Sequence, residues 1–177
     1  YDITELLNLG KKNQLEVKVA KESANRSINA AERKADWWLF GGIYRPVWLE
    51  VLPQIHMKHF VLSADHKGKF QASIDMEGDA KGHEIVVSVR SLKDGKTVYT
   101  SNGQTTITHP INNSGKEQMI SGEWTNIVPW STEAPNLYVV KLELKNPEGK
   151  IVQTRETRIG FRTVEFFPQD GVYLNGT

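Results

Sequence analysis

Residues 54–161 consist of short stretches in which apolar and polar residues alternate. In residues 69–76, for example, every second residue is apolar (Phe70, Ala72, Ile74 and Met76). An alternation with period two places the apolar side chains on one face of a β-strand. Turn signals separate the stretches about every 8–12 residues, and those at residues 92–96 and 146–149 predict hairpin turns. We therefore predict an all-β fold in which about seven short strands form an immunoglobulin-like β-sandwich. The predicted strands cover residues 56–64, 69–76, 85–89, 97–108, 118–127, 137–144 and 151–161.

The first third of the chain has a looser pattern. Residues 14–20 alternate, which predicts a half-buried strand with one apolar face (Leu15, Val17 and Val19). Residues 21–34 are polar and predict a loop that contains one helical turn at most.

Residues 36–51 are the segment richest in tryptophan, with three of the five in the chain. Its Gly41-Gly42 pair predicts a tight turn or bulge, because glycine adopts backbone angles that a Cβ forbids. Residues 47–51 then predict another strand, and we place a domain boundary at Leu52-Pro53.

Charge and composition exclude several classes of partner. Lys and Arg total 22 against 21 Asp and Glu, and the charges are interspersed, so no basic face for nucleic acid is expected. The chain has no cysteine, which excludes disulfides, thiolate zinc sites and a cysteine nucleophile. No apolar run approaches the roughly 20 residues that span a bilayer, so no membrane partner is expected. The compartment stays open, with the bacterial periplasm or cytoplasm as the expectation.

The histidines and glycines predict no metal site and no cofactor. His56 and His59 are three positions apart on a predicted strand, so their side chains point to opposite faces and cannot share one ion. The other three histidines fall at turns or strand ends, where we expect them to face solvent (His66, His83 and His109). The glycine pair is not followed by the Lys and Ser/Thr of a phosphate loop.

Paired carboxylates would indicate glycoside hydrolysis, and the candidate pairs are Asp75 with Glu77 and Asp79 with Glu84. A glycosidase acid needs a pKa raised by burial, and these positions on strand edges and turns predict solvated carboxylates instead. Asp36 is different because it precedes Trp37-Trp38. A carboxylate beside an aromatic surface can bind sugar hydroxyls while the ring stacks on the sugar. The alternative is a turn aspartate next to core tryptophans.

Four segments, in order along the chain, together resemble one enzyme family. Residues 36–49 (DWWLFGGIYRPVWL) resemble the segment D-x-W/F-x-x-x-G-I-x-R-x-V, which closes the jelly-roll sugar-binding domain of family 2 glycoside hydrolases. Residues 1–19 look like the strand pair of that domain, F-D-V-T-x-L-L followed by G-x-N-x-L-x-V-x-V. Residues 129–138 (PWSTEAPNLY) are similar to W-S-x-E-x-P-N-L-Y of the family's immunoglobulin-like domain. Residues 159–165 (IGFRTVE) and 174–176 (LNG) resemble the junction that leads into the catalytic barrel.

The resemblance implies a domain order. Residues 1–52 would be the C-terminal part of a jelly-roll (galactose-binding-like) domain, residues 53–162 the immunoglobulin-like sandwich, and residues 163–177 the lead into a missing (β/α)8 barrel. In the family both catalytic glutamates lie on that barrel, which needs roughly 250 residues. The expectation is therefore a non-catalytic, inactive piece of a retaining exo-β-glycosidase, a β-galactosidase first and a β-glucuronidase second, with the sandwich supporting the barrel.

The resemblance also implies roles for single residues. Asp36 would contact hydroxyls of the terminal sugar in the intact enzyme, and Arg45 would buttress its loop. Structural roles are expected for the other residues of the motifs (Trp48, Trp130, Tyr138 and Arg162), and Asn175 would lie in the linker turn. The expected partners are carbohydrate, the barrel of the same chain and a further copy in a homo-oligomer.

Two alternatives belong to other classes, a stand-alone carbohydrate-binding module and an immunoglobulin-like interaction module. A further expectation concerns residues 1–52, which cannot close a sandwich of their own. We expect them to pack on the immunoglobulin-like domain, to pair with another copy or to be poorly ordered, because unpaired strand edges are unfavourable.

Overall fold

The computed structural model describes residues 1–34, 41–113 and 116–177. The chain divides into two compact units, Tyr1–Glu50 and Val51–Thr177.

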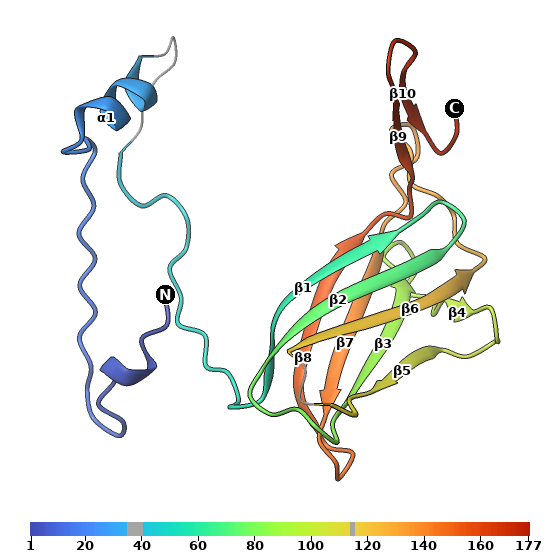
Figure 1. Ribbon diagram of the computed structural model, residues 1–177, viewed down its shortest axis with the longest axis horizontal. Coiled ribbons are helices and arrows are strands. Elements are labelled where there is room, and N and C mark those ends of the chain that lie inside the picture. Colours follow the sequence, from blue (N-terminus) through green and yellow to red (C-terminus); the bar gives the residue numbers. More distant parts are fainter. Residues whose placement is uncertain (35–40, 114–115) are drawn as a thin grey trace. The chain divides into compact units, whose positions relative to one another are not determined.

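The first unit contains the short 3-10 helix η1 (Thr4–Leu6) and the helix α1 (Arg26–Arg33) (Figure 1). The side chain of Asn25 begins α1 by accepting hydrogen bonds from the backbone N–H groups of Ser27 and Ile28. Arg33 lies in the last turn, where a positive charge is favourable near the free carbonyl groups. The expectation of one turn at most was therefore wrong, because the capping asparagine adds a further turn.

The strands predicted at residues 14–20 and 47–51 were also wrong, since the described residues of the first unit contain no strand. The alternating side chains of the first segment remain exposed to solvent (Leu15, Val17 and Val19). Alternation favours an extended chain, but a strand also needs a neighbour to supply ladder hydrogen bonds. The described part of this unit supplies no such neighbour.

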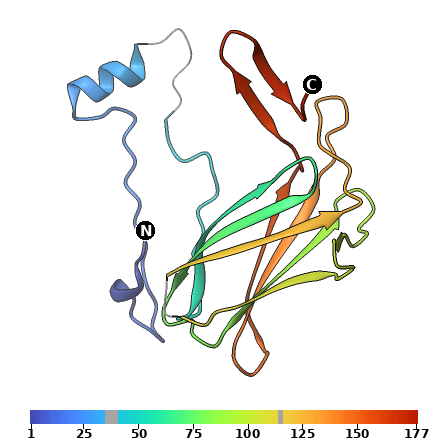
Figure 2. The same cartoon turned by 45° about the vertical axis from the view of Figure 1, so that its right-hand side comes forward.

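The described part of the second unit contains ten strands (Figures 1 and 2). They are β1 (His56–Ala64), β2 (Lys69–Glu77), β3 (Glu84–Ser91), β4 (Tyr99–Thr100), β5 (Thr106–Pro110), β6 (Glu117–Thr125), β7 (Tyr138–Lys145), β8 (Ile151–Ile159), β9 (Val164–Phe167) and β10 (Gly171–Leu174). The first eight form two antiparallel sheets, in the orders β1-β2-β6-β4 and β5-β3-β7-β8. The predicted all-β, immunoglobulin-like sandwich is confirmed.

The hydrophobic core lies between these two sheets, where the alternation predicted it. One sheet contributes Phe70, Ala72 and Ile74 from β2, and Ile120 and Trp124 from β6. The other contributes the inward residues of β3 and β7 (Ile85, Val87, Val89, Val140, Leu142 and Leu144). Within the core, the rings of Phe70 and Trp124 meet edge to face, with their centroids 6.4 Å apart.

Residues 97–108, predicted as one strand, form parts of two strands in different sheets. β4 pairs with β6, whereas β5 pairs with β3. A turn separates them, in which the backbone N–H of Gly103 donates to the carbonyl of Thr100 and Gly103 has φ 75°. The Thr100 hydroxyl also accepts a hydrogen bond from the backbone N–H of Gln104. This local turn carries the chain from one sheet to the other.

Within residues 163–177, β9 and β10 form an antiparallel hairpin that the sequence reading did not predict, and the role of this segment as a lead-in stays a prediction. The signal was present in the sequence, since an Asp170-Gly171 pair follows Pro168-Gln169 between two apolar runs. Among the described residues of the whole chain, no helix is long and apolar enough to cross a membrane.

Candidate functional site

The predicted sugar-binding residue Asp36 lies outside the described residues. Of the residues that follow it, Gly42 has φ 97°, a backbone angle that favours glycine. The guanidinium carbon of Arg45 lies 5.5 Å from the centre of the Tyr44 ring, and the side chain of Trp48 is 72% exposed. The roles assigned to these residues stay predictions.

The second unit brings two of the predicted motifs together at the end of β8. Trp130, from the segment between β6 and β7, donates its backbone N–H to the carbonyl of Phe161 at 2.9 Å. Its side chain lies against Gly160, where an added Cβ would come within 2.7 Å of the tryptophan Cβ. Only glycine at position 160 therefore allows this close approach. We call the group Trp130, Gly160, Arg162, Thr163 and Asn175 the junction cluster.

Within the junction cluster, Arg162 lies over the ring of Trp130, with 4.7 Å between the guanidinium carbon and the ring centre. This is the geometry of a cation–π contact. The backbone N–H of Arg162 donates to the carbonyl of Ala64 at the end of β1. Two residues predicted to be structural are thus in direct contact, although their functional role stays a prediction.

Asn175 ties the far end of the β9–β10 hairpin to its start. Its side-chain oxygen accepts from the backbone N–H of Thr163, and its side-chain nitrogen donates to the carbonyl of Trp130, both at 3.0 Å. Its own backbone N–H donates to the carbonyl of Thr163 at 2.8 Å. Asn175 has φ 56°, a conformation that asparagine tolerates better than most residues. Sequence reasoning placed it in a linker turn but gave no sign of these bonds.

The hydroxyl of Thr163 adds a contact that the sequence did not predict. It lies 2.7 Å from Nδ1 of His66 and also accepts from the backbone N–H of the same histidine. The turn between β1 and β2 is thereby joined to the junction cluster. His66 is half-buried, so the expectation that it faces solvent was only partly met.

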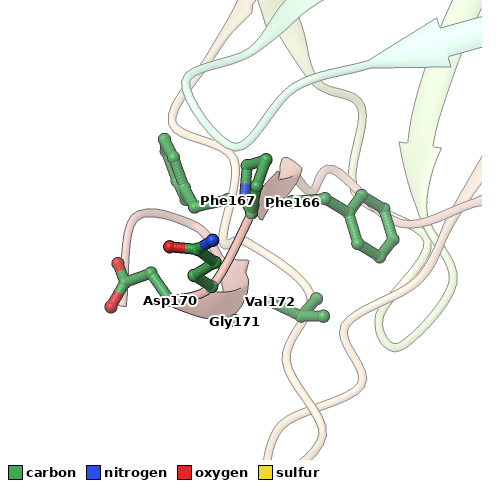
Figure 3. Close-up of a pocket in the computed structure, with 7 residues that line it drawn as sticks. Phe166, Phe167, Asp170, Gly171 and Val172 are labelled. Carbon is green, nitrogen blue, oxygen red and sulfur yellow. The ribbon is translucent and has the colours of Figure 1, made fainter.

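Beyond the junction cluster, the turn of the β9–β10 hairpin frames an open hollow of about 550 Å³ (Figure 3). Residues 166–172 line it. The ring of Tyr173 stacks edge to face on Phe167, and its hydroxyl donates to Asp170 at 2.8 Å. This hydrogen bond to a carboxylate raises the pKa of Tyr173 above its ordinary value.

A second hollow, of about 560 Å³, lies on the sheet that contains β1, β2 and β6. Its polar lining includes Lys69 and Glu123, which face each other in the register of β2 and β6, and Gln71 and Ser121, which do the same. Asp65 also lines it, but its carboxylate already accepts from the backbone N–H groups of residues 67 and 69. No aromatic ring is exposed among these lining residues, so a stacking platform for a sugar is missing there.

Three of the four carboxylates considered for acid–base chemistry, Glu77, Asp79 and Glu84, have structural partners. Glu77 pairs with Lys58 at 2.8 Å, and that hydrogen bond lowers the pKa of Glu77. Glu84 pairs with Lys145 at 3.4 Å, and Asp79 accepts from the backbone N–H of Lys81 in a turn.

The pKa shifts of other carboxyl groups have the same direction. Hydrogen bonds from Ser91 and Lys96 lower the pKa of Asp94 to about 2, and the hydroxyl of Thr132 lowers the pKa of Glu133. A glycosidase acid needs a raised pKa, so these three carboxyl groups (Glu77, Asp94 and Glu133) do not suit that role as they stand.

One histidine contradicts its expectation of a solvent-facing position. His83 is only 8% exposed, because it precedes β3 and its backbone bonds to residues 80 and 111 at the edge of the core. Its Nδ1 atom has no hydrogen-bond partner. In the described part of the chain, no group of three or more His, Asp or Glu residues could hold a metal ion.

The family model for glycosyl hydrolases family 2 matches residues 54–162, which contain all eight sandwich strands. A β-galactosidase of Priestia megaterium is 29% identical over 93% of this chain and 16% of its own length. A β-galactosidase of Kluyveromyces lactis is 31% identical over 99% of this chain and 18% of its own length.

This chain is also similar to a solved structure. The β-glucuronidase of Parabacteroides merdae matches with a TM-score of 0.58 and 26% identity, over 80% of this chain and 18% of that protein. The chain thus spans less than a fifth of the length of each of these three proteins.

Proposed function

Because this chain belongs to glycosyl hydrolase family 2, we propose that it is the non-catalytic sandwich portion of a larger retaining exo-β-glycosidase. The sandwich spaces and supports the active-site barrel of that enzyme, and the substrate is a terminal β-linked sugar, with a β-galactoside as the first choice. The observation that carries the proposal is the match of β-galactosidases along nearly all of this chain but less than a fifth of their own length.

The geometry of the second unit supports a supporting role. Its apolar side chains pack in a continuous core, and the hydrogen bonds of the junction cluster hold the β9–β10 hairpin. The carboxyl groups whose pKa is shifted are all shifted downward, toward permanent ionisation. Retaining hydrolysis needs a nucleophile and an acid with a raised pKa, which we assign to the barrel of the larger enzyme.

The first test compares the 177-residue chain with the longer protein that carries it, using 4-nitrophenyl β-D-galactoside and β-D-glucuronide. We expect no release of nitrophenol by the 177 residues and hydrolysis of the galactoside by the longer protein, with retention of the anomeric configuration. Hydrolysis by the 177-residue chain would overturn the non-catalytic assignment. Failure of the longer protein to cleave either glycoside would overturn the parent activity.

Within the same proposal, Asp36 contacts a hydroxyl of the terminal sugar. In the longer protein, Asp36→Asn should lower kcat/KM about 10- to 100-fold, because a hydrogen bond to a charged group is worth about 1.5–3 kcal/mol. Asp75→Asn is the matched control, since Asp75 is an exposed strand carboxylate of the sandwich. Equal kinetic effects of the two substitutions would contradict the role of Asp36.

A further inference from the structure

Two asparagine side chains of the sequence stand next to a backbone nitrogen with which they can react. Asn102 and Asn175 are each followed by glycine. In such a pair, the backbone nitrogen of the glycine can attack the side-chain carbon Cγ of the asparagine, because the glycine has no Cβ to hinder the approach. The asparagine then loses ammonia and is deamidated. The structure gives the two pairs different surroundings, so their reactivities should differ.

The side-chain amide of Asn175 is held at both of its polar atoms. Its Oδ1 accepts from the backbone N–H of Thr163, and its Nδ2 donates to the carbonyl of Trp130, both at 3.0 Å and both partly buried. Deamidation removes Nδ2 as ammonia, so the bond to Trp130 must be lost in the reaction. The bond to Thr163 also opposes any rotation of the amide toward the nitrogen of Gly176. Both bonds therefore slow the reaction at Asn175.

The side-chain amide of Asn102 lies in open solvent instead. Asn102 and its neighbours Ser101 and Gly103 are all exposed, in the turn between β4 and β5. Among the described residues this amide has no hydrogen-bond partner, so it is free to rotate. The attacking group, the backbone N–H of Gly103, donates to the carbonyl of Thr100 at 2.8 Å. This bond must open first, and bonds in exposed turns open at a low cost in free energy.

We propose that Asn102 is a deamidation site of the folded protein, and that the junction cluster protects Asn175 from the same reaction. Hydroxide removes the amide proton of Gly103, and the nitrogen forms a bond to Cγ of Asn102. The bond between Cγ and Nδ2 breaks, and Nδ2 takes a proton from water and leaves as ammonia. The product is a cyclic succinimide. Water then opens the ring at Cγ, which gives aspartate, or at the backbone carbonyl carbon, which gives isoaspartate.

The reaction changes the turn that carries the chain from one sheet to the other. Both products add one negative charge, and isoaspartate also lengthens the backbone by a methylene group. Within the described sheets, the two-residue strand β4 has β6 as its only neighbour. The backbone N–H of Thr100 also donates across the turn to the carbonyl of Gln104 at 2.8 Å. We expect isoaspartate to break this bond and to raise the hydrogen-exchange rate of the Thr100 amide.

Mass spectrometry of peptides from the aged protein tests the proposal. The 177-residue chain is kept in mildly alkaline buffer with and without urea, and the deamidated fraction of both asparagines is followed over time. In the folded chain, Asn102 should react at least about tenfold faster than Asn175, because two hydrogen bonds oppose the reaction at Asn175. In urea, the two rates should agree within about threefold, because unfolding removes the difference in surroundings.

Gly103→Ala tests which nitrogen attacks. The added Cβ meets open space in the folded turn, and in urea it hinders only the approach of the backbone nitrogen to Asn102. In urea, this variant should therefore slow the reaction at Asn102 and leave the rate at Asn175 unchanged. Asn175 is thus the internal control of the same sample.

Three results would overturn the proposal. The first is an Asn102 that reacts in urea but stays intact in the folded chain. The second is a folded chain in which Asn175 reacts as fast as Asn102 or faster, because the hydrogen bonds of the junction cluster then give no protection. The third is a rate at Asn102 that Gly103→Ala leaves unchanged in urea, because the glycine nitrogen is then not the attacking group.

Discussion

At the scale of single residues, Gly68 is the described glycine with the least space for a side chain, because it lies against the backbone of Trp124. A Cβ on Gly68 would lie 2.0 Å from the backbone oxygen of Trp124, and Gly68 has φ 100°. The carbonyl of Gly68 also accepts the backbone N–H of Trp124 at 2.9 Å. The turn between β1 and β2 therefore cannot move away from β6 without losing this bond.

Gly68→Ala should lower the free energy of unfolding by about 3 kcal/mol or more, because it combines a left-handed backbone angle with a steric clash. Gly95→Ala is the control, since Gly95 has φ 71° but open space around its missing Cβ. We expect about 1–2 kcal/mol for this control. Urea unfolding of both variants measures the difference. Equal losses of unfolding free energy would show that the protein relieves the clash between the new Cβ at position 68 and Trp124 at no cost.

We expect the carboxyl of Asp94 to make stability depend on pH. Hydrogen bonds from Ser91 and from the backbone N–H of Lys96 hold the pKa of Asp94 at about 2, below the value of 3.8 for a free aspartate. The folded-state pKa is lowered, so the stabilisation is present above about pH 3.8 and is lost as the pH falls toward 2.

Asp94→Asn removes this titration. We expect the variant to have a lower Tm than the parent at pH 5, and the difference to shrink as the pH is lowered to 2. Thermal unfolding of the two proteins across this range measures it, and NMR titration gives the pKa of Asp94 directly. A Tm difference that stays constant from pH 5 to pH 2 would contradict the lowered pKa.

At the scale of the elements, the β9–β10 hairpin depends on Asn175. Two side-chain hydrogen bonds of this residue join Thr163 and Trp130, which come from different parts of the chain. No local sequence pattern encodes such bonds, because the partners are 12 and 45 positions away.

Asn175→Ala should destabilise the hairpin by about 2–3 kcal/mol, since two hydrogen bonds are lost and the backbone angle becomes unfavourable. Asn175→Gly is the matched variant, because it loses the same bonds but tolerates φ 56°. Hydrogen exchange of the Thr163 and Leu174 amides measures the effect. If Asn175→Gly exchanged as slowly as the parent, the two side-chain bonds would be shown to contribute nothing.

At the scale of the whole molecule, all described residues of the hydrophobic core belong to Val51–Thr177. A piece with residues 51–177 should therefore fold without the first unit and unfold in one cooperative thermal transition. Circular dichroism and the dispersion of NMR signals measure this. A broad, non-cooperative transition of the piece would contradict an independent second unit.

The sequence predicted the sandwich well because buried strands repeat a local signal. Phe70 to Met76 and Ile85 to Val89 alternate with period two, and the structure buries these apolar residues. The two strands wrongly predicted at residues 14–20 and 47–51 share one physical cause, which is that a strand also depends on a remote partner. Val17 alternates as well as Val87 does, yet the described part of the first unit offers it no neighbouring strand.

The site was less predictable than the fold. Trp130 and Arg162 were singled out by resemblance, and the structure brings them into contact. The bonds of Thr163 to His66 and of Asn175 to Trp130 arise only from the tertiary structure. Asp36 lies outside the described residues, so its role remains a prediction.

The junction cluster also has a mechanical consequence. Arg162 bonds to Ala64 at the end of β1, Trp130 bonds to Phe161 after β8, and Asn175 closes the hairpin onto both Thr163 and Trp130. A force that pulls or twists the hairpin is therefore shared by several hydrogen bonds at once. We therefore expect the hairpin to keep its orientation on the sandwich under load better than a segment joined by a flexible linker would.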